Sequence, residues 1–163
     1  MSVFFLLDGY NILKSDETGL MEKGSLEDRR NTLISCIKTA RPQGSEKNRI
    51  AVVFDGKAEG YYSPGSFNKK IISGIEVIFS EGDSADTVIE KIVVEDKNPA
   101  RIVVVTDDKG IRKLLGCTGC RFMGTLEFVK KLFKKDINKN KEQKTSEKDL
   151  ISLNEELAKI WLK

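Results

Sequence analysis

The sequence predicts an α/β domain with a mostly parallel central sheet, followed by a C-terminal helix. Segments rich in Val, Ile, Leu and Phe alternate with segments in which apolar residues recur at helical spacing. The strand-like segments are continuously apolar, which is typical of parallel strands covered by helices on both faces. Three of them run directly into aspartate. A chain of 163 residues can also bury a substantial core, roughly two-thirds of its unfolded surface.

The N-terminal segments support this fold class. Residues 2–8 are apolar, lack a basic leader and end in an acid, so they predict a buried strand and not a signal peptide. Residues 25–41 place leucine and isoleucine at helical spacing and stop before a proline, which predicts a helix. Residues 49–55 predict the next strand, and residues 56–68, with glycine, two tyrosines and Ser-Pro-Gly, predict a loop.

The same alternation continues toward the C-terminus. Residues 75–80 and 101–106 predict strands, and residues 83–96 between them predict a helix with valine and isoleucine facing inward. The remaining predicted elements are a helix, a short strand and a helix at residues 109–115, 120–123 and 124–135. We therefore expect one domain over residues 1–135.

A lysine-rich segment follows this domain. Residues 130–148 contain eight lysines and three acids, a net charge of +5; the whole chain carries +3, so the remainder carries 3 − 5 = −2. Residues 136–145 predict a polar linker, and residues 146–163 predict an amphipathic helix that opens with a Ser-Glu-Lys-Asp sequence resembling a capping box. The lysines either attract a polyanion or are only solvated, and the helix either docks on the domain or binds a partner.

The composition excludes several classes of site. The chain has no histidine, which rules out Ser-His and Cys-His pairs, histidine acid–base chemistry and His-ligated zinc. The three cysteines argue against a disulfide framework, and Cys117 with Cys120 supplies only two of the four ligands of a structural zinc site. No apolar run approaches the roughly 20 residues of a membrane-spanning helix, so we expect a cytoplasmic protein with no membrane partner.

Aspartates stand where three predicted strands end: Asp8, Asp55 and the pair Asp107 and Asp108. Open α/β sheets bind their ligands at the carboxyl edge of the strands. A carboxylate cluster at that edge favours a hard cation such as Mg²⁺ and phosphate chemistry. Short acids also commonly form turns after strands, so each of these residues has a purely structural alternative. Asn11 could likewise bind a ligand or only stabilise a turn.

A further acidic group opens the predicted helix that starts near Asp83. Asp86 would lie in the first turn of this helix and Glu90 one turn later on the same side. The structural alternative is that Asp83 caps the helix and Asp86 favours its positive end. Because Asp86 and Glu90 flank Val88 and Ile89, which must face the core, we expect both carboxylates to tilt toward the sheet edge.

Together these motifs resemble the YacP-like NYN domains of the PIN-like, FLAP-type nuclease superfamily. The resemblance covers residues 1–135, and the tail is similar too. It rests on four motifs in order: Asp8-Gly-Tyr-Asn11, Val-Val-Phe-Asp55, Ser84-Ala-Asp86-Thr-Val-Ile-Glu90-Lys and Val105-Thr-Asp-Asp108. The resemblance implies a three-layer α/β/α PIN-like domain, Mg²⁺- or Mn²⁺-dependent phosphodiester cleavage and a relationship to ribosome-associated endoribonucleases.

The resemblance also implies individual roles. Asp8, Asp86 and Asp108 match the acids of the family motifs. Asp107 stands where the family pattern has serine, so either member of the Asp107–Asp108 pair could face a metal. Asp83 stands where the family often has glutamate. Arg30 matches an arginine of the second helix, which could reach a phosphate or pair with an acid.

We therefore expect a metal-dependent endoribonuclease that cleaves RNA, with single-stranded mRNA as its substrate and the ribosome as a partner. Asp8, Asp86 and Asp108 would hold one or two Mg²⁺ or Mn²⁺ ions. The assisting residues would be Asn11, Asp55, Asp83, Glu90 and Asp107. The expected RNA contacts are Arg30, Lys69, Lys70 and Arg112, with Tyr61 or Tyr62 stacked on an unpaired base.

Two other functions fit parts of this pattern. A non-catalytic RNA- or ribosome-binding module could have the same fold, but it would not need a complete and mutually repulsive set of acids. A small-molecule phosphohydrolase is disfavoured because Tyr10 occupies the second acid position of an Asp-x-Asp motif. The chain also lacks a Gly-x-x-x-x-Gly-Lys-Ser/Thr phosphate-binding loop.

Overall fold

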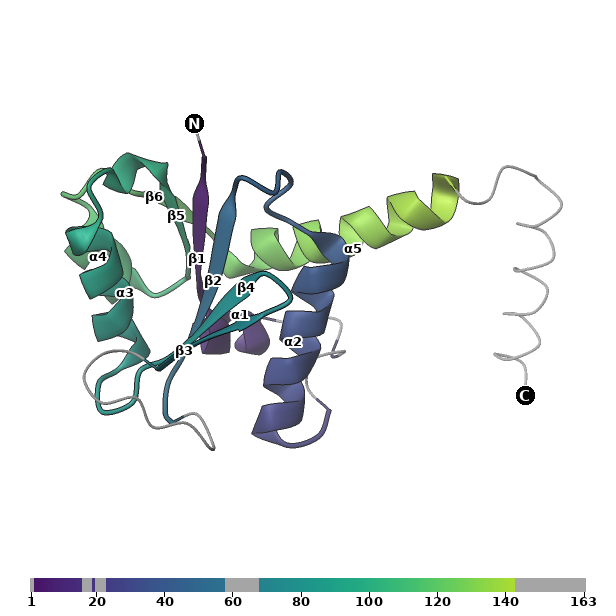
Figure 1. Cartoon of the computed structure of the whole chain (residues 1–163), viewed down its shortest axis with the longest axis horizontal. Helices are drawn as coiled ribbons and strands as arrows, with labels where there is room; N and C mark the ends of the chain where they lie inside the picture. The colour runs from purple at the N-terminus through teal and green to yellow at the C-terminus, as the bar shows by residue number, and fades with distance from the viewer. Residues whose placement is uncertain (1, 16–18, 20–22, 58–67, 143–163) are drawn as a thin grey trace, which may run out of the picture. The chain divides into compact units, whose positions relative to one another are not determined.

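The computed structural model describes residues 2–15, 19, 23–57 and 68–142 (Figure 1). It divides into two compact units, Met1–Leu132 and Phe133–Lys163. The sheet belongs to the first unit. The helix expected at residues 146–163 lies outside the described residues, as do Tyr61 and Tyr62.

A six-stranded sheet forms the centre of the first unit (Figure 1). Its strands are β1 (Phe4–Asp8), β2 (Arg49–Phe54), β3 (Asn68–Ile72), β4 (Ile75–Phe79), β5 (Ile102–Val105) and β6 (Arg121–Met123). They lie in the order β3-β4-β2-β1-β5-β6, and every neighbouring pair is parallel except β3 with β4. The predicted α/β fold with a mostly parallel sheet is therefore confirmed.

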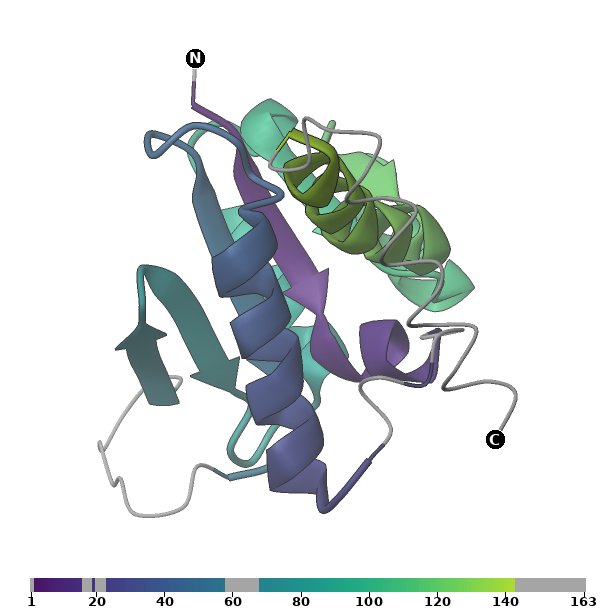
Figure 2. The same ribbon diagram turned by 90° about the vertical axis from the view of Figure 1, so that its right-hand side faces the viewer.

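Helices cover both faces of the sheet. Helix α2 (Leu26–Ala40) lies on one side, and α3 (Ala85–Glu95) and α4 (Lys109–Leu115) lie on the other (Figures 1 and 2). The strands are buried on both faces, as their continuous apolar runs predict: Leu6 and Leu7 of β1 are both fully buried. Each fully buried aliphatic side chain of this kind stabilises the fold by roughly 1.5–3 kcal/mol.

The strand register determines where the acids come together. Leu7 pairs with Val52 of β2 and with Val105 of β5, so the three central strands end level with one another. The chain then continues into Asp8, Asp55 and the Asp107–Asp108 pair, which therefore all leave the sheet at its carboxyl edge. A short 3-10 helix, η1 (Pro99–Arg101), leads into β5 at the opposite edge.

Polar caps fix the starts of the covering helices. Ser25 and Asp28 form a capping box at α2, in which the Ser25 hydroxyl accepts from the Asp28 amide and the Asp28 carboxylate accepts from the Ser25 amide. Ser84 caps α3 by accepting from the Thr87 amide over 3.2 Å. Asp108 caps α4. These contacts satisfy amides that have no partner inside the helix.

Three elements differ from the sequence-based expectation. Gly9–Lys14 forms a short helix, α1, although a motif of Gly, Tyr and Asn is more typical of a turn. Residues 68–72 form the antiparallel edge strand β3, which two lysines obscured in the sequence. The last described helix, α5 (Thr125–Glu142), continues past residue 135, where we expected the preceding helix to end, into the segment expected as a polar linker. Within the described residues, no helix combines the length and apolarity needed to cross a membrane.

Candidate active site

Asp8 is the central acid of the carboxyl edge. It ends β1, the strand between β2 and β5, and only 5% of it is exposed. Its Oδ2 accepts hydrogen bonds from Nδ2 of Asn11 over 2.9 Å and from the hydroxyl of Thr106 over 3.1 Å. Burial raises the pKa of Asp8, the bonds from Asn11 and Thr106 offset part of this rise, and the charge of Asp55 adds to it.

Thr106 was not among the sequence-predicted site residues, yet it connects two of them. It is fully buried after β5, and its amide donates to the carbonyl of Met123. Its hydroxyl donates to Asp8 and accepts from the amide of Asp108 over 3.1 Å. The sequence offered one weak signal, a hydroxyl residue between an apolar strand and the Asp107–Asp108 pair.

Asp86 lies in the first turn of α3, after the Ser84 cap. It is exposed, but its carboxyl is partly withdrawn from water. This partial burial raises the pKa of Asp86, and repulsion from Asp108, Asp8 and Asp55 raises it further. Asp86 therefore shares one negative field with all three acids, although they come from other elements.

The neighbours Asp107 and Asp108 have different partners. Oδ1 of Asp108 accepts from the amide of Ile111 over 3.0 Å, and its charge repels Asp86. Both carboxylate oxygens of Asp107 instead accept from Thr125, one from its amide over 3.1 Å and the other from its hydroxyl. The hydrogen bonds from Thr125 lower the pKa of Asp107. Asp108 is thus the member of the pair that belongs to the acidic group.

Asp55 joins the same edge from β2. Its Oδ1 accepts from the amide of Ala85 over 2.6 Å, which ties the end of β2 to the first turn of α3. The hydroxyl of Tyr10 donates to the backbone carbonyl of Asp55. The charge of Asp55 contributes to the raised pKa of both Asp8 and Asp86. Asp55 therefore positions the start of α3 and adds to the negative field.

Two expected assisting acids have other surroundings. Asp83 pairs with Lys91 over 3.2 Å, and each side chain is about half exposed (48%). Glu90 is half-buried one turn after Asp86 on α3. The charges that raise the pKa of Asp86 come from Asp108, Asp8 and Asp55. The structure thus gives direct contacts to the acidic edge for Asn11 and Asp55, while Asp83 is engaged with a lysine.

The expected RNA-binding cations lie in different settings. Arg30 of α2 donates from Nε and Nη2 to the Tyr10 hydroxyl over 3.2 and 2.8 Å. Its guanidinium also lies over the rings of Phe54 and Phe79, 5.7 and 5.3 Å from their centres. Tyr10 follows Asp8 by two residues and donates to the backbone carbonyl of Asp55, so Arg30 is linked to the acidic edge through Tyr10.

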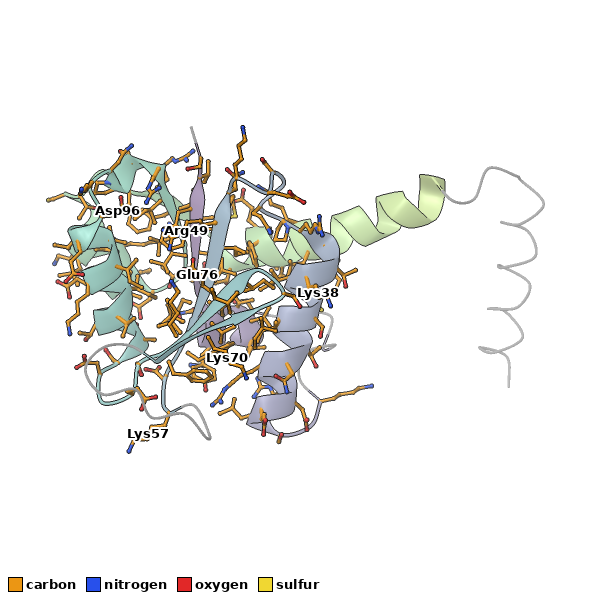
Figure 3. All side chains as sticks on the ribbon, in the orientation of Figure 1. Lys38, Arg49, Lys57, Lys70, Glu76 and Asp96 are labelled. Carbon is orange, nitrogen blue, oxygen red and sulfur yellow. The ribbon has the colours of Figure 1, made fainter. Side chains whose placement is uncertain are left out.

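Arg112 lies next to the Asp107–Asp108 pair and its charge helps to lower the pKa of Asp107, whereas Lys69 of β3 is engaged by another acid. Arg112 donates from Nε and Nη2 to the carbonyl of Thr106 over 3.1 and 2.9 Å, so it braces the end of β5. Lys69 pairs with Glu76 of β4, which also pairs with Arg49 over 3.0 Å. Figure 3 shows Glu76 and Arg49 on their neighbouring strands, with Lys70 farther along the β3–β4 hairpin.

The donor set fits a hard cation by its chemistry. Aspartate oxygens from four separate elements are the ligands that Mg²⁺ and Mn²⁺ prefer. Within the part of the chain that the structure describes, however, no three His, Cys, Asp or Glu side chains are arranged to hold a metal ion directly. The acids repel one another across a shared edge without converging on one point.

Comparison with known proteins identifies the family. The family model of the YacP-like NYN domain matches residues 5–162. The chain belongs to this family. NYN domains are nucleases, so the family supports a hydrolase-type function for this YacP-like NYN domain.

Two solved structures share the fold of this YacP-like NYN domain. The crystal structure of Rae1 (YacP) from Bacillus subtilis is 27% identical with a TM-score of 0.65, and the match covers 99% of this chain and 92% of that one. A mutant of the same protein is 26% identical with a TM-score of 0.65, covering 96% and 91%. The resemblance to the family that the motifs indicated is therefore confirmed. No curated protein matches the chain significantly.

Proposed function

We propose that this YacP-like NYN domain is a metal-dependent endoribonuclease that hydrolyses phosphodiester bonds in RNA. The observation that carries the proposal is the gathering of four acids at the carboxyl edge of the sheet: Asp8, Asp55, Asp86 and Asp108. Burial raises the pKa of Asp86, and repulsion from the other three acids raises it further. Four acids from separate elements repel one another at the edge where α/β sheets place their sites. A bound cation would offset this repulsion, and carboxyls whose pKa is shifted by burial together with charged neighbours are candidates for a functional site.

Asp8, Asp86 and Asp108 would hold the metal, Mg²⁺ or Mn²⁺. When bound, the metal supplies Lewis acidity at the scissile phosphate and lowers the pKa of water. The residues of the chain hold this set in place. Thr106 and Asn11 orient Oδ2 of Asp8, and the Ile111 amide orients Asp108.

Arg30 is proposed to bind a phosphate of the RNA next to the scissile bond. It lies on rings that fix its direction, and it is joined to the acidic edge through Tyr10. A guanidinium bound in this way loses little rotamer freedom when it contacts a phosphate. Lys69, Lys70 and Arg112 remain candidates for contacts farther along the strand; for Lys69, the RNA would have to compete with Glu76.

The finer identity of the substrate rests on the family. We propose single-stranded mRNA, cleaved in association with the ribosome in the cytoplasm. The lysine-rich segment 130–148, with its net charge of +5, supports a polyanionic partner. The C-terminal helix expected at residues 146–163 is a candidate contact with that partner.

One observation favours a second candidate, a non-catalytic RNA- or ribosome-binding module. Among the described residues, the acids are not arranged as a direct metal site. Such a module would bind RNA through Arg30 and the lysines and would show no metal-dependent cleavage. The two candidates therefore differ in their response to divalent cations.

The deciding experiment combines cleavage with metal binding. Single-stranded RNA is incubated with the protein in Mg²⁺, in Mn²⁺ and in EDTA, with and without ribosomes. We expect cleavage that EDTA abolishes and that D86N loses by at least a hundredfold. E95Q is the matched control, because Glu95 is an exposed acid at the opposite end of the same helix, α3. The second candidate would be established instead if the protein bound RNA but showed neither cleavage nor saturable Mn²⁺ binding, with or without ribosomes.

A further inference from the structure

Helix α5 begins without a cap of its own. Its first residue is Thr125, and the residue before it, Gly124, has no side chain to receive the free amides of the first turn. Asp107 takes this role from 18 residues away, with Oδ1 accepting from the Thr125 amide and Oδ2 from the Thr125 hydroxyl. The carboxylate is therefore held at two points by the start of another element.

The Thr125 hydroxyl has a neighbour on each side. The Asp107 carboxylate can only accept, so the single hydroxyl proton of Thr125 goes to it. Ser15 Oγ lies 2.6 Å from Thr125 Oγ1 on the other side. The Ser15 hydroxyl donates to the carbonyl of Asn11 over 2.9 Å, and the Ser15 amide donates to the same carbonyl over 3.2 Å. These contacts connect Asp107, through Thr125 and Ser15, to the end of α1.

Asp107 lies between two residues that contact the acidic edge. Thr106 on one side donates to Asp8, and Asp108 on the other side repels Asp86. At its other end the same chain of bonds reaches α1 at Ser15, one turn after Asn11, which also donates to Asp8. The buried hydroxyl of Thr125 therefore joins both segments that hold the acids.

We propose that Thr125 and Asp107 are positioning residues of the active site. Their contact fixes the turn from Thr106 to Asp108, so that Asp108 faces Asp86 while the extra carboxylate of Asp107 is directed away from the metal position. Ser15 extends this support to α1. The consequence for metal affinity rests on the proposed function, whereas the consequence for the rigidity of the turn does not.

The test compares T125V, which removes the hydroxyl at constant shape, with T125S, which keeps it. T32V is the matched control, because the Thr32 hydroxyl donates to a carbonyl of its own helix, that of Asp28, away from the acidic edge. In the metal-free protein we expect the amides of Asp108 and Ile111 to exchange with deuterium about tenfold faster in T125V than in T125S or T32V. Removing supporting contacts of this kind typically weakens metal binding by about 10- to 100-fold, so the Mn²⁺ dissociation constant should rise about tenfold in T125V alone.

Activity separates positioning from RNA binding. In T125V, kcat at limiting Mn²⁺ should fall about tenfold while KM for RNA stays within twofold. A folded T125V with amide exchange and Mn²⁺ affinity within twofold of the wild type would overturn the proposal. If the wild type bound no Mn²⁺, the proposed function would fail. The comparison of amide exchange between T125V and T125S would still show whether Thr125 holds the turn from Thr106 to Asp108. If T125V did not fold, S15A, which removes only the outer hydroxyl, would be tested by the same readouts.

Discussion

The hydroxyl of Thr106 donates to Oδ2 of Asp8 over 3.1 Å, and so connects the ends of β5 and β1 across 98 positions of sequence. The hydroxyl oxygen of Thr106 also accepts from the amide of Asp108. One buried hydroxyl therefore satisfies a buried carboxylate and the backbone of a second acid at once. Because Thr106 is fully buried, water cannot replace it when it is removed.

Replacing Thr106 by valine should shift the pH dependence of activity. The Thr106 hydrogen bond lowers the pKa of Asp8 against the effect of burial, so its loss raises that pKa further. The acid limb of the kcat/KM profile should move to higher pH in T106V. T106S, which keeps the hydroxyl, should follow the wild type. A profile of T106V that coincided with that of the wild type would contradict the proposed role of Asp8 as an ionised ligand.

The same substitution should also destabilise the fold. T106V removes a donor from the buried Asp8 carboxylate and the acceptor of the part-buried Asp108 amide. The loss of a hydrogen bond to a buried group costs about 1–3 kcal/mol. Urea unfolding followed by circular dichroism measures this cost. T118V is the matched control, because the Thr118 hydroxyl donates to the carbonyl of Leu115 and accepts from the amide of Cys120 in a partly buried turn away from the acids. It should cost less than T106V.

Replacing Asp86 by asparagine should stabilise the metal-free protein at neutral pH. The pKa of Asp86 is raised above its ordinary 3.8, so folding favours the protonated form. Below pH 3.8 the Asp86 carboxyl is protonated in both the folded and the unfolded protein, so it does not destabilise the fold. As the pH rises through the raised pKa of the folded state, the carboxylate ionises beside the other acids and the folded protein becomes less stable. D86N should therefore unfold at higher urea than the wild type at pH 7, with the difference vanishing near about pH 3.

Bound Mg²⁺ should reverse the order of stability of D86N and the wild type. A ligand present at 100 times its dissociation constant stabilises the folded state by about 2.7 kcal/mol, provided that the unfolded chain does not bind it. With saturating Mg²⁺ the wild type should become more stable than D86N, which loses a proposed ligand. Equal stabilisation of both proteins by Mg²⁺ would remove Asp86 from the metal site.

The sequence predicted the acidic edge because each of its parts has a local signal. An apolar run that ends in aspartate marks the end of a buried parallel strand, as at Asp8 and Asp55. Ser84 followed by Asp86 marks a capped helix start. These signals involve residues a few positions apart, and the alternation of strands and helices then brings them to one edge.

The parts that could not be predicted depend on contacts between distant segments. Nothing near Thr106 in the sequence indicates that it will meet Asp8. The sequence also left open which of Asp107 and Asp108 faces a metal, since the contacts that distinguish them include Thr125, which lies 18 residues beyond Asp107. Helix α1 was missed because its capping residue, Asp8, directs its side chain to other partners and forms no side-chain cap.

Replacing Gly9 by alanine should destabilise the protein, although alanine normally favours a helix by about 1 kcal/mol over glycine. A Cβ at residue 9 would lie 2.3 Å from the Phe54 ring and 3.0 Å from the Val53 carbonyl oxygen. Phe54 is fully buried and cannot move aside. We expect a loss of roughly 1–3 kcal/mol, as for other overpacked cores, measured by urea unfolding. G82A is the matched control, because no atom of the residues that the structure describes lies within 4 Å of its added Cβ.

Replacing Arg30 by glutamine should weaken RNA binding in a salt-dependent way. When one phosphate of a single strand is no longer neutralised by the protein, the slope of log K against log salt decreases in magnitude by about 0.7. For R30Q we expect this decrease, and a weaker affinity at low salt, in a titration of catalytically inactive protein carrying D86N. K47Q, which removes one exposed charge from the loop before β2, should leave the slope unchanged. An unchanged slope in a folded R30Q would assign Arg30 to packing against Tyr10, Phe54 and Phe79 and not to RNA.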